Sequence, residues 1–211
     1  MQLINLPMQN QSSKYIYKLE PGDRLMIYPS NDNIYVIIDG ILIINKLFSN
    51  QEKFSTDLIY TGYIIYNLFQ THKISNYCYE VEPLSTSYII SIDYKKNNDI
   101  YQYSQVLYNT AHHGHALLSH INLLDLWVHK NIKHRIIHLV LALCEIAGQD
   151  YQTYIRIDIR LTYNTIATIT GSNRNTVSTL MKQLETDRLL IHQIPYIIVN
   201  NIFKLNSYTI R

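Results

Sequence analysis

The spacing of hydrophobic residues over positions 1–103 predicts short β-strands. Runs rich in isoleucine, valine and tyrosine alternate with turn-forming residues such as Pro21-Gly22-Asp23 and Asn31-Asp32-Asn33. The expected strands cover residues 15–19, 24–29, 34–44, 54–60, 63–69, 76–81 and 87–93. Asp39-Gly40 breaks the run at 34–44 and predicts a tight hairpin there. Short strands at near-regular spacing indicate an all-β barrel, sandwich or roll.

The pattern becomes helical after residue 103. Between residues 104 and 131, apolar residues recur at three- and four-residue steps, at Leu107, Ala111, Gly114, Leu118, Ile121 and Val128. Such a long stripe favours a helix that pairs with its twin in a dimer. The alternative is a helix that lies on its own β-domain. Four histidines in this segment lack the acidic or thiolate partners of a metal site and are typical of a solvated face: His112, His113, His115 and His120.

Residues 132–211 predict a winged helix-turn-helix domain. A helix over 131–148 precedes a half-exposed strand at 154–161, two short helices around Gly171, and a hairpin with strands at 189–192 and 196–199. Thr162 is a suitable N-cap for the first short helix, and Ser172 or Asn173 for the second. Gly171 suits a sharp turn because it has no Cβ. The second short helix has an apolar back, formed by Val177, Leu180, Met181 and Leu184.

The front of this second short helix carries side chains that can read DNA. An arginine can bond guanine, an asparagine can bond adenine, and lysine or threonine can hold phosphate. An ordinary helical hairpin with a solvated polar face has the same pattern, so spacing alone leaves both interpretations open. The candidate DNA-binding residues are Thr162, Ser172, Asn173, Arg174, Asn175, Thr176, Ser178, Thr179 and Lys182.

The same segment resembles the helix-turn-helix of the Crp/Fnr transcription regulators at Ile166-Ala167, Gly171, Arg174, Thr176-Val177-Ser178 and Leu184-Glu185. The resemblance implies an α+β fold with three parts. These are a β-roll effector-type domain, similar to cyclic-nucleotide-binding jelly rolls, at 1–103, a dimerisation helix at 104–131 and a winged helix-turn-helix at 132–211. It also implies a homodimer that binds palindromic double-stranded promoter DNA and acts with RNA polymerase. The alternative is a ligand-sensing module that regulates a protein partner.

Residues 123–148 resemble the NtcA-type global nitrogen regulators of that family and their plastid-encoded relatives in red algae, at 127–131, Arg135 and 139–145. This implies an activator of nitrogen-controlled genes with 2-oxoglutarate as effector. The chain departs from the pattern at Thr179, where a second arginine is usual. Ala116 and Ile121 occupy the positions of the arginine and glutamate of the effector pocket. Without a cation there, a dicarboxylate loses its charge-assisted partner, so no cofactor is evident and we expect weak 2-oxoglutarate coupling.

The charge is unevenly placed in this chain of 211 residues. Residues 130–211 carry 10 Lys/Arg and 5 Asp/Glu, a net +5, whereas residues 1–129 carry 8 and 11, a net −3. Such asymmetry fits a nucleic-acid-binding C-terminal half.

Other classes of function are disfavoured. The sequence has no nucleophile elbow, metal triad or phosphate loop, so we expect no enzyme. Cys78 and Cys144 form no CxxC pair, which speaks against a zinc or iron–sulfur site. The sequence contains no run of 18 or more apolar residues, so we expect no membrane span. Isoleucine, asparagine and tyrosine, which have AT-rich codons, are abundant. Together with the red-algal resemblance, this predicts a plastid-encoded protein of the chloroplast stroma, with a bacterial cytoplasm as the alternative.

Overall fold

The computed structural model describes residues 2–4, 14–31, 33–66, 68, 76–93 and 120–208. The chain divides into two compact units. The N-terminal unit comprises Met1–Lys53 and Asp57–Ile121, and the C-terminal unit comprises Phe54–Thr56 and Asn122–Arg211. Among the described residues, no helix combines the length and the apolar character needed to cross a bilayer.

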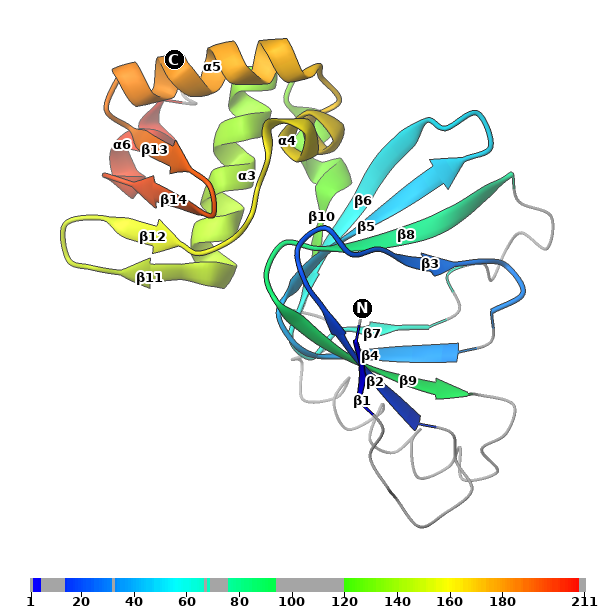
Figure 1. Cartoon of the computed structure of the whole chain (residues 1–211). Helices are drawn as coiled ribbons and strands as arrows, with labels where there is room; N and C mark the ends of the chain where they lie inside the picture. The colour runs from blue at the N-terminus through cyan, green and yellow to red at the C-terminus, as the bar shows by residue number, and fades with distance from the viewer. Residues whose placement is uncertain are drawn as a thin grey trace. The chain divides into compact units, whose positions relative to one another are not determined.

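The N-terminal unit is built from two five-stranded sheets (Figure 1), of which only residues 54–56 in β6 and Asn122 in β10 belong to the C-terminal unit. The first has the order β1 (Gln2–Ile4), β2 (Lys14–Leu19), β9 (Ser87–Asp93), β4 (Asn33–Asp39) and β7 (Ile64–Ile65). The second has the order β10 (His120–Asn122), β6 (Lys53–Tyr60), β5 (Ile41–Phe48), β8 (Tyr77–Pro83) and β3 (Leu25–Ile27). The expected succession of short strands is therefore confirmed, and most of the predicted runs lie within one residue or two of an observed strand.

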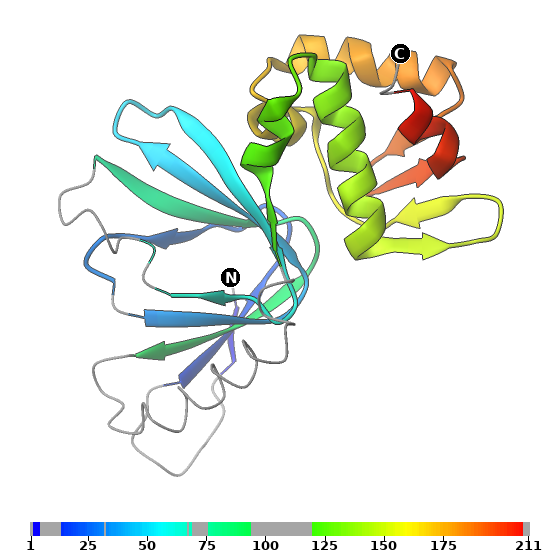
Figure 2. The same cartoon turned by 180° about the vertical axis from the view of Figure 1, so that it is seen from behind.

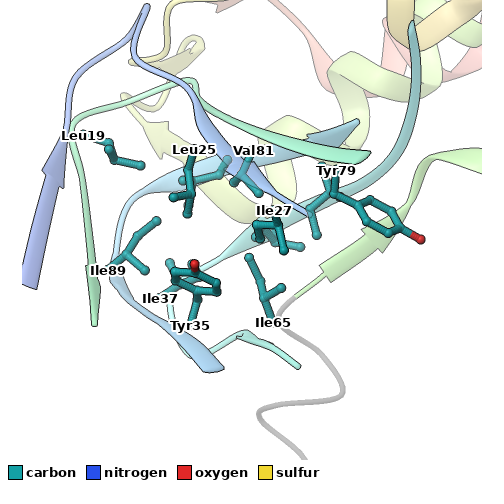
Figure 3. Packing of buried hydrophobic residues seen from close by; sticks show 12 residues of the cluster. Leu19, Leu25, Ile27, Tyr35, Ile37, Ile65, Tyr79, Val81 and Ile89 are labelled. Atoms are coloured by element: carbon teal, nitrogen blue, oxygen red, sulfur yellow. The ribbon is translucent and has the colours of Figure 1, made fainter. Parts of the chain in front are cut away.

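The two sheets enclose a single apolar core (Figure 3). Ile37 and Ile89 reach it from the first sheet, and Leu42, Ile44 and Val81 from the second; each is at most 1% exposed. The alternation of inward and outward side chains along each strand explains this packing, because successive residues point to opposite faces of a sheet. Burial of aliphatic side chains from two facing sheets is the main source of stability in such a unit.

The hairpin predicted at Asp39-Gly40 is wrong. β4 pairs with β7 and β9 in the first sheet, whereas β5 lies in the second sheet, so the chain passes between sheets at this point. Gly40 has φ +104°, and a Cβ on it would lie 2.1 Å from the hydroxyl oxygen of Ser87. The N–H of Ile41 donates to the Ser85 hydroxyl at 3.0 Å. A distant segment therefore turns the chain away from hairpin pairing.

The continuous helix predicted over 104–131 is wrong for the portion described. Residues 104–119 lie outside the described residues, while residues 120–122 form β10 and η1 (Leu123–Val128) is a 3-10 helix. The Asn122 side chain accepts the N–H of Leu124 at 2.9 Å and begins η1. Leu123 and Leu126 are both buried. A three-residue apolar step suits a 3-10 helix, in which side chains three apart lie on one side.

The C-terminal unit is a winged helix-turn-helix, as predicted (Figures 1 and 2). Its helices are α3 (Ile132–Ala147), α4 (Tyr163–Thr170), α5 (Arg174–Thr186) and α6 (Ile202–Ser207). Its four-stranded sheet has the order β11 (Gly148–Asp150), β12 (Ile155–Ile157), β14 (Tyr196–Val199) and β13 (Leu190–Gln193). The N-terminal unit of strands and the helical C-terminal unit together make the predicted α+β fold.

Candidate DNA-binding surface

The turn between α4 and α5 is fixed by local hydrogen bonds. The Thr162 hydroxyl accepts the N–H of Thr165 at 3.1 Å and caps α4, which buries Ile166 and Ile169. Gly171 ends α4 in the left-handed conformation with φ +64°, a region that glycine enters without steric cost. The N–H of Ser172 donates to the Ala167 carbonyl at 2.9 Å. The predicted roles of Thr162 and Gly171 are confirmed.

Helix α5 begins at an asparagine cap and presents a polar face to solvent. The Asn173 side chain accepts the N–H of Thr176 at 2.8 Å. Val177, Met181 and Leu184 are fully buried, and they recur at the three- and four-residue steps of one helix face. This burial directs the other residues outward: Arg174, Asn175, Thr179 and Lys182 line the polar side, and Ser178 is half-buried.

The structure separates the nine candidate residues into two groups. Arg174, Asn175, Ser178, Thr179 and Lys182 lie on the outer side of α5, from which side chains can reach a groove of DNA. The other four belong to the turn and the first turns of the helices: Thr162, Ser172, Asn173 and Thr176. The side-chain oxygens of Thr162 and Asn173 already accept capping hydrogen bonds. The Ser172 hydroxyl oxygen is buried, without a hydrogen-bond partner among the described residues.

An open groove of about 530 Å³ adjoins this outer face. It is lined by Lys133, Thr179, Lys182, Gln183, Thr186, Asp187 and Tyr208. The Lys133 ammonium stands 4.3 Å from the centre of the Tyr208 ring. The Tyr208 hydroxyl donates to the Asp187 carboxylate at 2.6 Å. Both lysines of the groove can approach an anion such as a phosphate.

Lys133 is a candidate that sequence reasoning missed. It lies in the first turn of α3, and the N-terminal end of α3 lies against α5 in both views (Figures 1 and 2). The motif contains only the residues around Gly171, so periodicity could not bring Lys133 next to Lys182. The only sequence signal that included it was the surplus of basic residues after position 129.

The wing is fastened to the helix-turn-helix by polar contacts. The N–H of His192 in β13 donates to the Glu185 carboxylate of α5 at 2.9 Å. The His192 Nε2 atom lies 2.7 Å from the Leu161 carbonyl, and its ring stacks on Tyr163 at 4.9 Å. Burial raises the pKa of Tyr163 above its usual value. These contacts hold β13, α4 and α5 as one body.

The described residues contain no cluster of metal-binding side chains, and the thiol of Cys144 is unreactive by its surroundings. No group of three or more histidine, cysteine or acidic side chains among them could hold a metal ion. Cys144 is buried in α3, and burial raises the pKa of its thiol to about 11. Such a thiol is protonated at neutral pH and packs as a small apolar residue.

Comparisons with known proteins agree with this geometry. Residues 134–208 match the family of the Crp-like helix-turn-helix domain. A curated protein of Porphyra purpurea, ycf28, named as an HTH-type transcriptional regulator, is 29% identical over 201 residues, which are 92% of this chain and 81% of that protein.

Solved structures share the fold. A transcriptional regulator of the CRP family from Thermus thermophilus has a TM-score of 0.68 at 12% identity, over 92% of this chain and 97% of that one. A CooA mutant from Carboxydothermus hydrogenoformans has a TM-score of 0.65 at 16% identity, over 94% and 88%. FixK2 from Bradyrhizobium japonicum has a TM-score of 0.63 at 13% identity, over 94% and 97%.

Proposed function

We propose that the chain is a transcriptional regulator of the Crp/Fnr family that binds palindromic promoter DNA as a homodimer. The match of residues 134–208 to the family of the Crp-like helix-turn-helix domain supports this proposal. Its relatives are regulators rather than enzymes. In the proposal, α5 enters the major groove of each half-site. A two-fold dimer places two such helices about 34 Å apart, one turn of B-DNA.

The observation that supports this proposal best is the outer face of α5. Arg174 and Asn175 stand at the N-terminal end of the helix, where recognition helices contact base edges. Thr179 and Lys182 follow on the same face and line the groove with Lys133. Arg174 and Asn175 therefore read bases, whereas Lys182 and Lys133 hold the phosphate backbone.

The proposal extends to the biological role and the location of the protein. The resemblance around 127–131, Arg135 and 139–145 supports an activator of nitrogen-controlled genes that recruits RNA polymerase. The similarity to a protein of the red alga Porphyra purpurea, together with the AT-rich amino-acid usage, supports a plastid location.

We propose that binding of 2-oxoglutarate is coupled weakly, or not at all, to binding of DNA. Ile121, at one of the two effector positions, lies in β10 rather than on a helix, and its side chain carries no charge. Ala116, at the other position, lies outside the described residues. We therefore propose that 2-oxoglutarate changes DNA affinity little.

Selection of bound sites from a pool of random double-stranded DNA tests the proposed function. We expect an inverted repeat whose half-site centres lie about 10 base pairs, one helical turn, apart. A single asymmetric site would contradict the homodimer. Failure to enrich any sequence would favour the alternative, a module that acts by docking on a protein partner.

A further inference from the structure

One arginine connects the turn of the helix-turn-helix to the segment that precedes α3. The Arg135 Nε atom donates to the carbonyl of His129 at 2.7 Å. Its Nη1 atom donates to the carbonyl of Thr170, the last residue of α4, at 2.9 Å. The guanidinium thus bridges two backbone carbonyls that are far apart in sequence. Each bond is charge-assisted and stronger than a neutral hydrogen bond.

The indole ring of Trp127 completes this arrangement. The Arg135 guanidinium carbon lies 4.6 Å from the ring centre, a distance at which a cation is attracted to an aromatic face. The ring also lies against Gly171, where an added Cβ would be 2.1 Å from the Cη2 atom of Trp127. Two features therefore require glycine at position 171: the left-handed backbone conformation, and the space that the indole ring of Trp127 occupies.

We propose that Trp127 and Arg135 form a clamp that positions the turn of the helix-turn-helix, and thereby α5, for sequence-specific DNA binding. The clamp consists of Trp127, Arg135 and the backbone of His129, Thr170 and Gly171. The clamp joins η1 to the turn from which α5 begins. Both lie in the C-terminal unit. Both residues are positioning residues and need no contact with DNA. The inference rests on the proposed function.

A lysine cannot replace this arginine. Its ammonium is a single point of charge, whereas the planar guanidinium donates in two directions while it lies on an aromatic face. Arg135→Lys keeps the net charge of the domain but loses at least one of the two carbonyl bonds. The Thr170 carbonyl at the end of α4 then no longer holds the turn against η1. Side chains that read bases must be held within about 0.5 Å of their working positions.

The test uses the full chain and compares wild type with Arg135→Lys, Trp127→Leu and the charge control Lys204→Gln. Lys204 is exposed on α6 and does not line the groove. Affinities are measured for the selected palindrome and for a scrambled duplex across a salt series. For both clamp variants we expect the palindrome to bind about ten- to a hundredfold more weakly, the size of losing one base-pair contact. Affinity for scrambled DNA and the salt slope should stay unchanged, because no phosphate contact is lost.

A second readout does not involve DNA. Trp127 is the only tryptophan of the chain, so its fluorescence reports the clamp directly. Arg135→Lys should shift its emission to longer wavelength as the ring loses its guanidinium cover, whereas Lys204→Gln should not. Circular dichroism confirms that each variant is folded at the temperature used.

The outcomes separate the clamp from the proposed function. Wild-type affinity for Arg135→Lys on the palindrome, with unchanged emission, would overturn the clamp and leave the DNA-binding function intact. An equal loss of affinity for both DNAs, with a lower salt slope in Trp127→Leu or Arg135→Lys, would mean that the residue contacts phosphate or that the whole domain is disturbed. This result would also overturn the clamp. Wild-type protein that does not distinguish the two DNAs would overturn the proposed function itself.

Discussion

Arg174 is the only arginine of α5, and it stands exposed at the first position of the helix. A guanine contact by an arginine is bidentate and specifies one base pair. Thr179, on the same helix, can make no such contact, so in the proposed function the guanine contact of each half-site depends on Arg174 alone. At this scale, single substitutions distinguish base reading from phosphate binding.

Arg174→Ala should weaken binding to the selected palindrome by about 1–3 kcal/mol and relax the preference at one position per half-site. The measurement is a comparison of sites selected by the variant and by wild type. Lys204→Ala, which removes one positive charge from α6, is the matched control. An equal loss on every DNA sequence would show that Arg174 contacts phosphate instead.

Lys133→Ala should weaken binding uniformly across sequences and reduce the salt slope by about 1 for each protomer, because it removes one phosphate contact. Asp187→Asn changes the charge of the same groove in the opposite direction. It removes a negative charge and should strengthen binding to every sequence. If neither substitution alters the salt slope, the groove lies away from the DNA backbone.

At the scale of elements, local chemistry was predictable and long-range pairing was not. Thr162, Gly171 and Asn173 act as expected because a cap depends on residues within one helical turn. The hairpin at Asp39-Gly40 failed because Ser85 and Ser87, far away in sequence, direct Gly40 and Ile41 to another sheet. The clamp and the groove were missed for the same reason, since Arg135 and Lys133 reach α4 and α5 only after folding.

A histidine cluster, formed by His129 just before α3 and by His134 and His138 within it, is expected to make the stability of the fold depend on pH. The rings of His129 and His138 stack at 4.0 Å, and His134 meets His129 edge-on at 6.4 Å. Burial lowers the pKa of His138 from its usual value, and the nearby His129 and His134 lower it further. The folded state therefore prefers neutral His138.

The sign of the pH effect follows from this shift. The stabilising contribution of neutral His138 is complete above its unfolded pKa of about 6.5 and is lost as the pH falls below that value. Wild-type protein should lose more stability than His138→Asn between about pH 7.5 and about pH 5.5. Urea unfolding followed by Trp127 fluorescence measures this loss. Equal pH dependence in the two proteins would show that His138 titrates normally.

At the scale of the whole molecule, the chain combines a unit with a closed apolar core and a unit that carries the helix-turn-helix with its candidate DNA-binding face. Core residues such as Ile37, Val81 and Ile89 fill the space between the two sheets of the N-terminal unit (Figure 3). The surplus of basic residues lies after position 129, where the helix-turn-helix and the wing are found. In the proposed function, the second unit is the one that binds DNA.

The coupling between 2-oxoglutarate and DNA binding is a property of the whole molecule and can be measured. An effector shifts DNA affinity only by its different affinity for the two states of the protein. Because Ala116 and Ile121 supply no cation, 2-oxoglutarate at millimolar concentration should raise affinity for the palindrome by less than about tenfold. A titration followed by DNA binding decides this. A much larger rise would mean that another residue supplies the positive charge.

The most direct test of sequence-specific DNA binding through α5 is a salt series on two DNAs. Affinities of the full chain for the selected palindrome and for a scrambled duplex are measured between about 50 and about 200 mM salt. We predict that both affinities fall steeply and linearly on logarithmic axes, because lysines release counterions from phosphates. We also predict that the palindrome binds at least about a thousandfold more tightly than the scrambled duplex at every salt concentration. Equal affinities for the two DNAs, or an affinity that does not change with salt, would contradict sequence-specific binding through α5.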